Sequence, residues 1–305
     1  MTSRGAASPR GGRSVLFPAG LVAAVATASP RTDPALTQDR VGAGRWNARL
    51  TGRPRARTGA REGVWAAVAD GVGSLPESAR AAQIAIDLMR RAAQPRAAQP
   101  RAATASGAFR CADEQIRREL DGNGATTLLT VHAGPDGATV RWVGNGALLL
   151  VASSPHTTST GLPPPGVQVL HTDLLLPHII FRDGRDVLKH VLGGSGQVAV
   201  ETVVLGPSAR GPRLLLAVTD GLHSAEQPDV GVSDDGSRWQ RQTTALQAIL
   251  ALAGGVLRDA QLTDALSEQD LQDRLQQLLS GLLTARQLDD DASVAAVLLP
   301  AAQAH

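Results

Sequence analysis

The sequence predicts an α+β protein built as a layered sandwich, and three observations predict it. Apolar runs of strand length recur along the chain, helical patterns occur in two separate pairs, and turn residues bound most of the strands. The order is strands, two helices, strands, two helices and a last strand. A doubly wound α/β fold would alternate strands with helices, so this order favours layered α+β packing.

The predicted strands are apolar runs, many of them bounded by glycine, proline or aspartate. They are Leu21–Ala26, Val64–Ala69, Thr126–Val131, Thr139–Val143, Ala147–Val151, Val167–His171, Val198–Val204, Leu214–Thr219 and Ser293–Leu299. A Gly-Pro-Asp-Gly sequence at residues 134–137 separates the third and fourth runs, which predicts an antiparallel hairpin. Glycines and prolines between residues 153 and 177 predict a long irregular excursion.

Two pairs of helices are predicted between these strands. The first pair is Glu77–Ala93 and Thr104–Leu120, separated by a five-residue tandem repeat whose prolines break helices. The second pair is Thr243–Leu252 and Asp270–Leu283, and leucines recur at helical spacing in its last member. Ser267, followed three residues later by Asp270, is typical of an N-terminal capping pair.

Composition limits the classes of function. A hydrophobic content of 43% in 305 residues is enough for one sizeable core, and the net charge of +2 argues against a nucleic-acid partner. The single cysteine, Cys111, excludes an intrachain disulfide and a cysteine-based zinc site. No apolar run approaches the roughly 18 residues that cross a bilayer, so no membrane partner is expected.

The N-terminus has two interpretations. Residues 4–28 carry three arginines followed by an apolar stretch, which is the pattern of a signal peptide for export. Pro18 and Gly20 interrupt that stretch, and Leu21–Ala26 fits the first strand of the domain, so we favour a cytoplasmic protein. The predicted organisation is a disordered tail over residues 1–14, a single domain over 15–301 and a short tail over 302–305.

Acidic residues lie at the ends of predicted strands that are far apart in the sequence. Asp70 and Asp220 each end an apolar strand, Asp39 follows the first strand, and Asp290 precedes the last. A charge at the mouth of a buried strand needs a partner, and a cation is the obvious one. Carboxylates alone, without cysteine or histidine, suit Mg²⁺ or Mn²⁺ rather than zinc. Gly71 would leave its carbonyl accessible to an ion or water.

Six motifs in order resemble those of the metal-dependent Ser/Thr protein phosphatases of PPM type (type 2C), in a bacterial-like form. The resemblance extends from about residue 21 to 300. It implies a four-layer α-β-β-α sandwich of two antiparallel sheets flanked by helix pairs. The motifs are Thr37-Gln38-Asp39, Ala69-Asp70-Gly71-Val72-Gly73, Gly124-Ala125-Thr126-Thr127, Trp142 to Leu150, Leu214 to Leu222, and Asp290-Asp291-Ala292-Ser293-Val294.

The resemblance also implies an activity, the hydrolysis of phosphoserine and phosphothreonine in proteins by a water that bridges two divalent metals. Asp70 would bridge the two ions, and the Gly71 carbonyl would assist one of them. Asp220 and Asp290 would complete the second site, and Asp39 would act through waters around the first. Asp70, Asp220 and Asp290 would be catalytic through the metal-bound water. A cognate Ser/Thr kinase is the expected counterpart.

Departures from the family pattern leave alternatives open. Pro34 stands where the family places a phosphate-binding arginine, and Arg31 is either its substitute or an exposed loop cation. Asn145 replaces an acid that helps to bind a third metal, which counts against a third site, or it merely holds a turn. The alternatives are a non-catalytic phosphatase-like binding module and a small-metabolite phosphatase. The histidines, His178 among them, lack catalytic spacing and are predicted to be ordinary strand or surface residues, with His223 the exception to watch.

Overall fold

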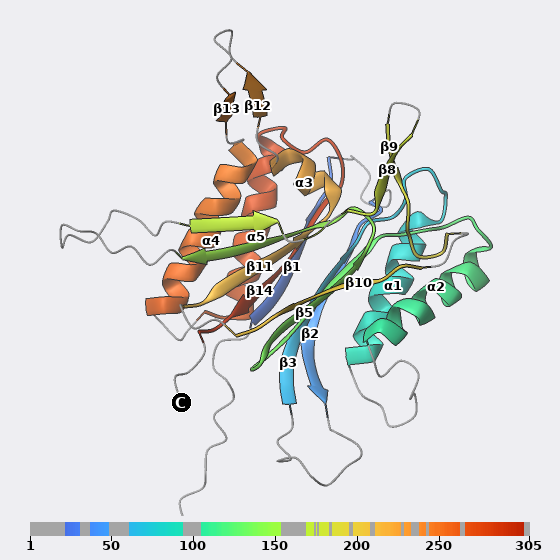
Figure 1. The fold of residues 1–305 in the computed structure, drawn as a ribbon, viewed down its shortest axis with the longest axis horizontal. Helices are drawn as coiled ribbons and strands as arrows, with labels where there is room; N and C mark the ends of the chain where they lie inside the picture. Colours follow the sequence, from blue (N-terminus) through green and yellow to red (C-terminus); the bar gives the residue numbers. More distant parts are fainter. Residues whose placement is uncertain are drawn as a thin grey trace, which may run out of the picture.

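The protein is a four-layer sandwich in which two antiparallel sheets lie between two pairs of helices (Figure 1). The fold class predicted from the sequence is confirmed. The structure is a computed structural model. It describes residues 22–30, 37–48, 61–93, 105–153, 169–173, 175, 177–182, 185–194, 198–207, 211–226, 229–232, 238–241, 244–262 and 266–301. The predicted tails, Pro34 and Arg31 lie outside these residues, so the predicted domain boundaries stay predictions.

Among the described residues, each of the two main sheets has five strands. The first sheet has the order β1 (Val22–Ala28), β14 (Ala292–Leu299), β11 (Arg213–Val218), β6 (Ala147–Ser153) and β7 (Val169–Asp173). The second has the order β10 (Glu201–Leu205), β5 (Gly137–Val143), β4 (Leu128–Gly134), β3 (Arg61–Ala69) and β2 (Arg40–Ala48). The predicted hairpin is the antiparallel pair β4 and β5.

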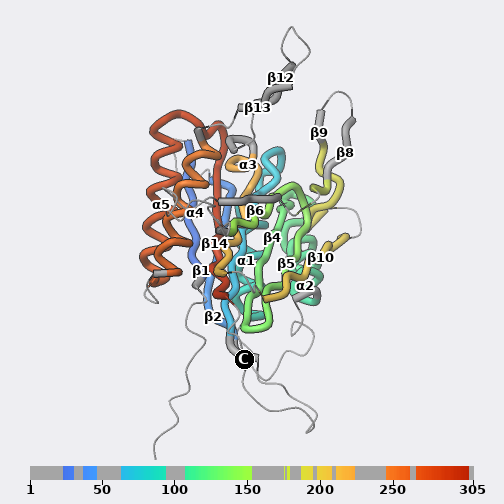
Figure 2. Tube along the Cα trace, turned by 60° about the vertical axis from the view of Figure 1, so that its left-hand side comes forward, coloured from blue at the N-terminus to red at the C-terminus, as the bar shows by residue number. Residues whose placement is uncertain are grey.

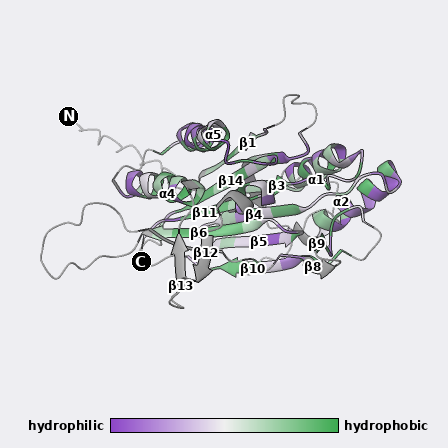
Figure 3. Cartoon of the chain, turned by 90° about the horizontal axis from the view of Figure 1, so that it is seen from above, coloured by the Kyte–Doolittle hydropathy of each residue, from purple (hydrophilic) through white to green (hydrophobic). Residues whose placement is uncertain are grey.

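The helices form the outer layers, and Figures 2 and 3 show one pair on each side of the two sheets. Helices α1 (Ser78–Ala93) and α2 (Ala105–Leu120) pack on the second sheet. Helices α4 (Thr244–Leu262) and α5 (Glu268–Thr284) pack on the first sheet. Among the described residues, no helix is long and apolar enough to cross a membrane.

Three apolar layers hold the sandwich together, and β14 shows how one strand serves two of them. All eight of its residues are buried. Val294, Ala296 and Leu298 point toward α4 and α5, whereas Ala295 and Val297 point toward the second sheet. Alternate residues of a strand face opposite sides of the sheet, so a strand that is buried on both sides is apolar throughout.

Strand β2 was not predicted, and its glycines explain why. Gly42 and Gly44 give this segment a poor strand propensity. In the structure the Trp65 ring lies across both of them, and a Cβ at Gly42 would lie 2.8 Å from Ile86 Cγ2. The glycines therefore make room for a buried tryptophan between β2 and α1.

Several shorter elements also differ from the sequence predictions. The hairpins β8 (Ile179–Arg182) with β9 (Arg185–Leu188), and β12 (Asp229–Val232) with β13 (Arg238–Arg241), were not predicted. Residues 198–200 precede β10 rather than belonging to it. Asp220 begins a short helix, α3 (Asp220–Glu226), directly after β11. Helix α4 continues through Gly254 and Gly255 to Leu262, ten residues beyond its predicted end.

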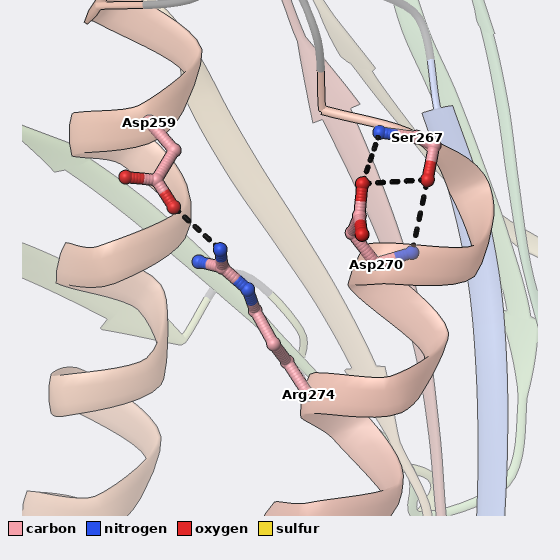
Figure 4. Close-up of polar contacts among 4 residues, drawn as sticks. All are labelled: Asp259, Ser267, Asp270 and Arg274. Carbon is pink, nitrogen blue, oxygen red and sulfur yellow. Dashed lines mark hydrogen bonds and ion pairs between the residues drawn. The ribbon is translucent and has the colours of Figure 1, made fainter.

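Figure 4 shows two polar contacts of the α4–α5 pair. Arg274 of α5 forms an ion pair with Asp259 of α4 at 2.5 Å. At the start of α5, the Ser267 hydroxyl accepts a hydrogen bond from the backbone N–H of Asp270, whose carboxylate accepts one from the backbone N–H of Ser267. The predicted capping pair is confirmed as a reciprocal capping box.

Replacing the cap, Ser267→Ala, is expected to lower the free energy of unfolding by about 1 kcal/mol, because an N–H at the helix start loses its acceptor. Urea unfolding followed by circular dichroism measures the change. Ser280→Ala, at an exposed position inside α5, is the matched control and is expected to change stability by less than about 0.5 kcal/mol. Equal effects of the two substitutions would contradict the capping role.

Candidate metal centre

Three of the predicted acidic residues meet at one end of the two sheets. Asp39 lies immediately before β2, Asp70 immediately after β3, and Asp220 begins α3 just beyond β11. The Asp70 side chain contacts those of both Asp39 and Asp220. The first two acids come from the second sheet and Asp220 comes from the first sheet. Residues separated by up to 181 positions therefore converge where the sheets face one another.

Asp39 is held by a network of hydroxyl groups and has only 2% of its surface exposed. Its Oδ2 accepts a hydrogen bond from Thr219 Oγ1 at 2.8 Å, and Thr219 Oγ1 in turn accepts one from the backbone N–H of Ser293. Ser293 Oγ lies 2.8 Å from Thr27 Oγ1. The network joins a residue of the second sheet to β1, β11 and β14 of the first.

The backbone of Asp70 is fixed by two consecutive threonines. Its N–H donates to Thr127 Oγ1 at 3.1 Å, and its carbonyl accepts bonds from the Thr127 N–H and the Thr126 hydroxyl, both at 2.8 Å. These bonds keep the end of β3 in register with the start of β4, so the Asp70 carboxylate has a defined direction.

Gly71 lies opposite Thr126 in an antiparallel bridge, but the backbones of these two residues are not hydrogen-bonded to each other. The flanking bonds run from the Val72 N–H to the Ala125 carbonyl and from the Thr127 N–H to the Asp70 carbonyl. In such an antiparallel pair the central residue directs its carbonyl away from the partner strand. The Gly71 carbonyl is therefore not used in this pairing, as its predicted role requires.

Burial and crowding of the carboxyls raise the pKa values of the two inner acids. Burial is the main cause for Asp70, and the charges of Asp39 and Asp220 raise its pKa further. Burial also raises the pKa of Asp39, although the hydrogen bonds from its neighbours oppose the rise. Among the described residues, no arginine or lysine is a leading cause of either shift. Without a cation, the raised pKa values of Asp39 and Asp70 keep these two carboxyls protonated at a pH where ordinary carboxyls have lost their protons.

Asp291, which follows the predicted ligand Asp290, is close enough to Asp39 for its charge to raise the pKa of Asp39. A Cβ at Gly221 would lie 2.1 Å from the Asp291 carbonyl oxygen, so the start of α3 packs directly on this segment. Asp291 is buried and accepts hydrogen bonds from Ser29 Oγ and the backbone N–H of Gln38. Asp290 is exposed, and its Oδ1 accepts the Asp291 N–H at 2.8 Å. The predicted ligand Asp290 thus lies at the surface, next to a buried acid that anchors the segment before β2.

Asn145 does more than hold a turn, because its side chain reaches the acids. Its Nδ2 donates to Asp220 Oδ2 at 2.8 Å. This bond fixes one oxygen of Asp220. Position 145 therefore holds a neutral amide beside the acids and not a further carboxylate. The interpretation that Asn145 merely holds a turn is therefore wrong. The amide comes from the turn between β5 and β6, and the carboxylate comes from the first residue of α3.

The chemistry of the residues present suits hard divalent cations. The donors are carboxylate oxygens, which Mg²⁺ and Mn²⁺ prefer, and their crowding needs positive charge. Asp39 Oδ1 and Asn145 Oδ1 are buried and accept no hydrogen bond from the described residues. Within the described ranges, no group of three or more acidic, histidine or cysteine side chains is already spaced around one point. Instead, the Asp70 carboxyl contacts those of Asp39 and Asp220 directly.

Comparison with known proteins agrees with this fold. The family model for protein phosphatase 2C matches residues 55–163, which include Asp70, Gly71 and Asn145. A bacterial serine phosphatase is similar in structure, with a TM-score of 0.57 at 13% identity, over 92% of this chain and 99% of that chain. Curated protein sequences give no significant match.

Two mycobacterial structures are also similar. The serine/threonine phosphatase PstP/Ppp of Mycobacterium tuberculosis has a TM-score of 0.52 at 15% identity, over 92% of this chain and 99% of that one. The PPM Ser-Thr phosphatase MsPP of Mycobacterium smegmatis, in complex with cacodylate, has a TM-score of 0.53 at 19% identity, over 90% and 97%. The resemblance to bacterial PPM-type phosphatases, stated from six sequence motifs, is therefore confirmed, and this chain has their fold.

Proposed function

We propose that this protein is a metal-dependent Ser/Thr protein phosphatase that uses two divalent ions, Mg²⁺ or Mn²⁺. Asp39, Asp70, Asp220, Asp290 and the Gly71 carbonyl would hold the ions. The substrate would be a phosphoserine or phosphothreonine protein in the cytoplasm, supplied by a cognate Ser/Thr kinase. The convergence of Asp39, Asp70 and Asp220 from two different sheets is the observation that carries this proposal.

In the proposed reaction, a water attacks phosphorus in line as the bond from phosphorus to the serine or threonine oxygen breaks, which gives inorganic phosphate and a free hydroxyl. Bound divalent ions would lower the pKa of the attacking water and offset the negative charge of the phosphate. The chain supplies the fixed positions. Thr219 orients Asp39, Thr126 and Thr127 fix the backbone of Asp70, and Asn145 fixes one oxygen of Asp220.

The phosphate group of the substrate would also bind a residue of the chain. Arg31 is proposed for it because Pro34 occupies the position at which the resembling family places an arginine. Both residues lie outside the described part of the chain. Kinetics of Arg31→Ala test the assignment, and a rise in KM for a phosphopeptide with unchanged metal binding would support it.

Hydrolysis of a phosphothreonine peptide and of p-nitrophenyl phosphate, with and without Mn²⁺, tests the proposal directly. We expect turnover that requires the metal and that prefers the peptide in kcat/KM. Absence of Mn²⁺-dependent turnover of either compound would reject the phosphatase proposal. Calorimetric titration with Mn²⁺ then tests the alternative of a non-catalytic binding module, because such a module need not bind two ions. A higher kcat/KM for a small phosphorylated metabolite than for the peptide would favour the alternative of a small-metabolite phosphatase.

A further inference from the structure

His178 lies just before the β8–β9 hairpin and makes two backbone contacts with one glycine. Its N–H donates to the Gly144 carbonyl at 2.8 Å, and its ring Nδ1 accepts from the Gly144 N–H at 3.3 Å. The ring also stacks on Trp142, with ring centres 6.2 Å apart, and meets the edge of His190 at 5.2 Å. Both hydrogen-bonding groups of the Gly144 backbone are therefore bonded to His178.

The turn that His178 holds carries the amide next to the acids. Gly144 has a φ of +110°, and a Cβ there would lie 2.5 Å from Thr127 Cγ2, so this backbone needs glycine. The next residue, Asn145, donates to Asp220 Oδ2 at 2.8 Å. A continuous set of short contacts thus runs from the base of the hairpin, through a constrained turn, to a proposed metal ligand.

We propose that His178 is a positioning residue, which holds the Gly144–Asn145 turn so that Asn145 keeps Asp220 oriented for metal binding and phosphate hydrolysis. The inference rests on the proposed function and deepens it. His178 itself touches neither the acids nor, on this assignment, the substrate. It acts through the turn, and it couples the position of the β8–β9 hairpin to the orientation of Asp220.

The protonation state of His178 agrees with this geometry. Nδ1 accepts a hydrogen bond from an N–H, so it carries no proton, and the proton of the neutral ring is on Nε2. Burial lowers the pKa of His178, and so do the neighbouring His190 and Lys189, while Glu201 raises it. A neutral ring is the form that can accept from Gly144.

The far end of the same segment is anchored independently of His178. Leu192 and Thr126 exchange backbone hydrogen bonds at 2.9 and 3.1 Å. The Gly193 N–H donates to Asp113 of α2 at 2.8 Å, and Arg117 forms an ion pair with the same carboxylate. Because these contacts hold residues 192–193, loss of the His178 bond is expected to loosen the Gly144–Asn145 turn without releasing the whole segment.

Two substitutions at His178 distinguish the effect of its hydrogen bond to Gly144 from the effect of its aromatic ring. His178→Phe keeps an aromatic ring for stacking on Trp142 but removes the acceptor at the Nδ1 position. His178→Asn removes most of the ring but places an amide oxygen close to the former Nδ1. His190→Phe controls for aromatic packing, because it keeps a ring beside His178. Thermal unfolding of each variant checks that it is folded.

Three measurements are made on each variant: the hydrogen-exchange rate of the Gly144 amide in the metal-free chain, Mn²⁺ affinity by calorimetry, and kcat with KM. For His178→Phe we expect exchange about 5- to 10-fold faster, because one hydrogen bond is lost. We expect Mn²⁺ affinity and kcat to fall about 10-fold, as for other residues that orient a ligand, with KM changed less than about 2-fold. His178→Asn is expected to recover most of each change, and His190→Phe to cause none.

The exchange and calorimetric results decide the inference even if the wild type hydrolyses no phosphate ester, which would reject the proposed function alone. Unchanged Gly144 exchange in a folded His178→Phe variant overturns the inference. So does faster exchange with unchanged Mn²⁺ affinity, because the turn would then not act on Asp220. Failure of His178→Asn to recover exchange would show that the ring, rather than the acceptor, matters.

Discussion

Asp70→Asn is expected to abolish Mn²⁺-dependent phosphate hydrolysis and, at the same time, to stabilise the metal-free chain at pH 8 by about 1–2 kcal/mol. The two effects have one cause. Asp70 lies in contact with two other carboxyls, where burial and their charges raise its pKa. An asparagine keeps the shape, loses the charge and can donate hydrogen bonds to Asp39 and Asp220.

The same pKa shifts fix the pH dependence of the metal-free protein. The unfolded chain releases the protons of Asp39 and Asp70 at about pH 4, whereas the folded chain retains them to higher pH because both pKa values are raised. The folded state then binds more protons than the unfolded state, so stability falls as pH rises from about 4 through the raised pKa values. Asp70→Asn should make the loss of stability with rising pH smaller. Mn²⁺ should reduce that loss in the wild type only.

Thermal unfolding from pH 5 to 9, with and without Mn²⁺, measures both effects. Asp290→Asn is the matched control, because it removes another proposed metal ligand from an exposed position. It is expected to lower activity while changing the stability of the metal-free chain by less than about 0.5 kcal/mol. If Asp70→Asn destabilised the metal-free chain at pH 8, the crowding of the carboxyls would not be what lowers its stability at this pH.

Gly71→Ala is expected to destabilise the protein by about 1–3 kcal/mol and to remove Mn²⁺-dependent activity. A Cβ at Gly71 would lie 2.8 Å from both the carbonyl carbon and the carbonyl oxygen of Ser78, at the first residue of α1. Backbone atoms at a helix start cannot move aside cheaply, so the end of β3 would shift and carry Asp70 with it.

Gly73→Ala, two residues further on, tests whether this effect is specific. A Cβ there would approach only Gln38 Oε1, at 3.4 Å, and that is the end of a flexible side chain. We expect its unfolding free energy to stay within about 0.5 kcal/mol of the wild type. Urea unfolding of both variants gives the comparison, and similar losses would mean that the whole turn, rather than the contact with Ser78, limits substitution.

The parts of the fold that the sequence predicted are those in which a local pattern and burial agree. The central strands β3, β6, β11 and β14 are continuous apolar runs, because both of their faces are covered. Helix α5 has leucines at helical spacing and a capping box. Strand β2 was missed because its glycines accommodate Trp65, and that residue belongs to a different strand.

The acids of the candidate site could be predicted, because their positions at strand ends are visible in the sequence. The residues that orient these acids could not, because their contacts depend on how distant segments pack. Aspartates at strand ends indicated which residues would meet, and Asp39, Asp70 and Asp220 do so. The hydroxyls of Thr219 and Ser293 that orient Asp39 look like ordinary strand residues in the sequence. The contact of His178 with Gly144 joins residues on either side of an excursion, and no spacing rule indicates it.

The pairing of β1 with β14 determines when this site can exist during synthesis. Val22 lies opposite Leu298, so the first sheet cannot be completed until the residues of β14 have been made. Strands β2 to β5 are available by residue 143, and they can pair while the ribosome is still adding residues. Asp39 and Asp70 would then lie near each other before Asp220 and Asp290 have been added to the chain. On the proposed function, the chain should therefore gain metal affinity only after Asp220 and β14 have joined the fold.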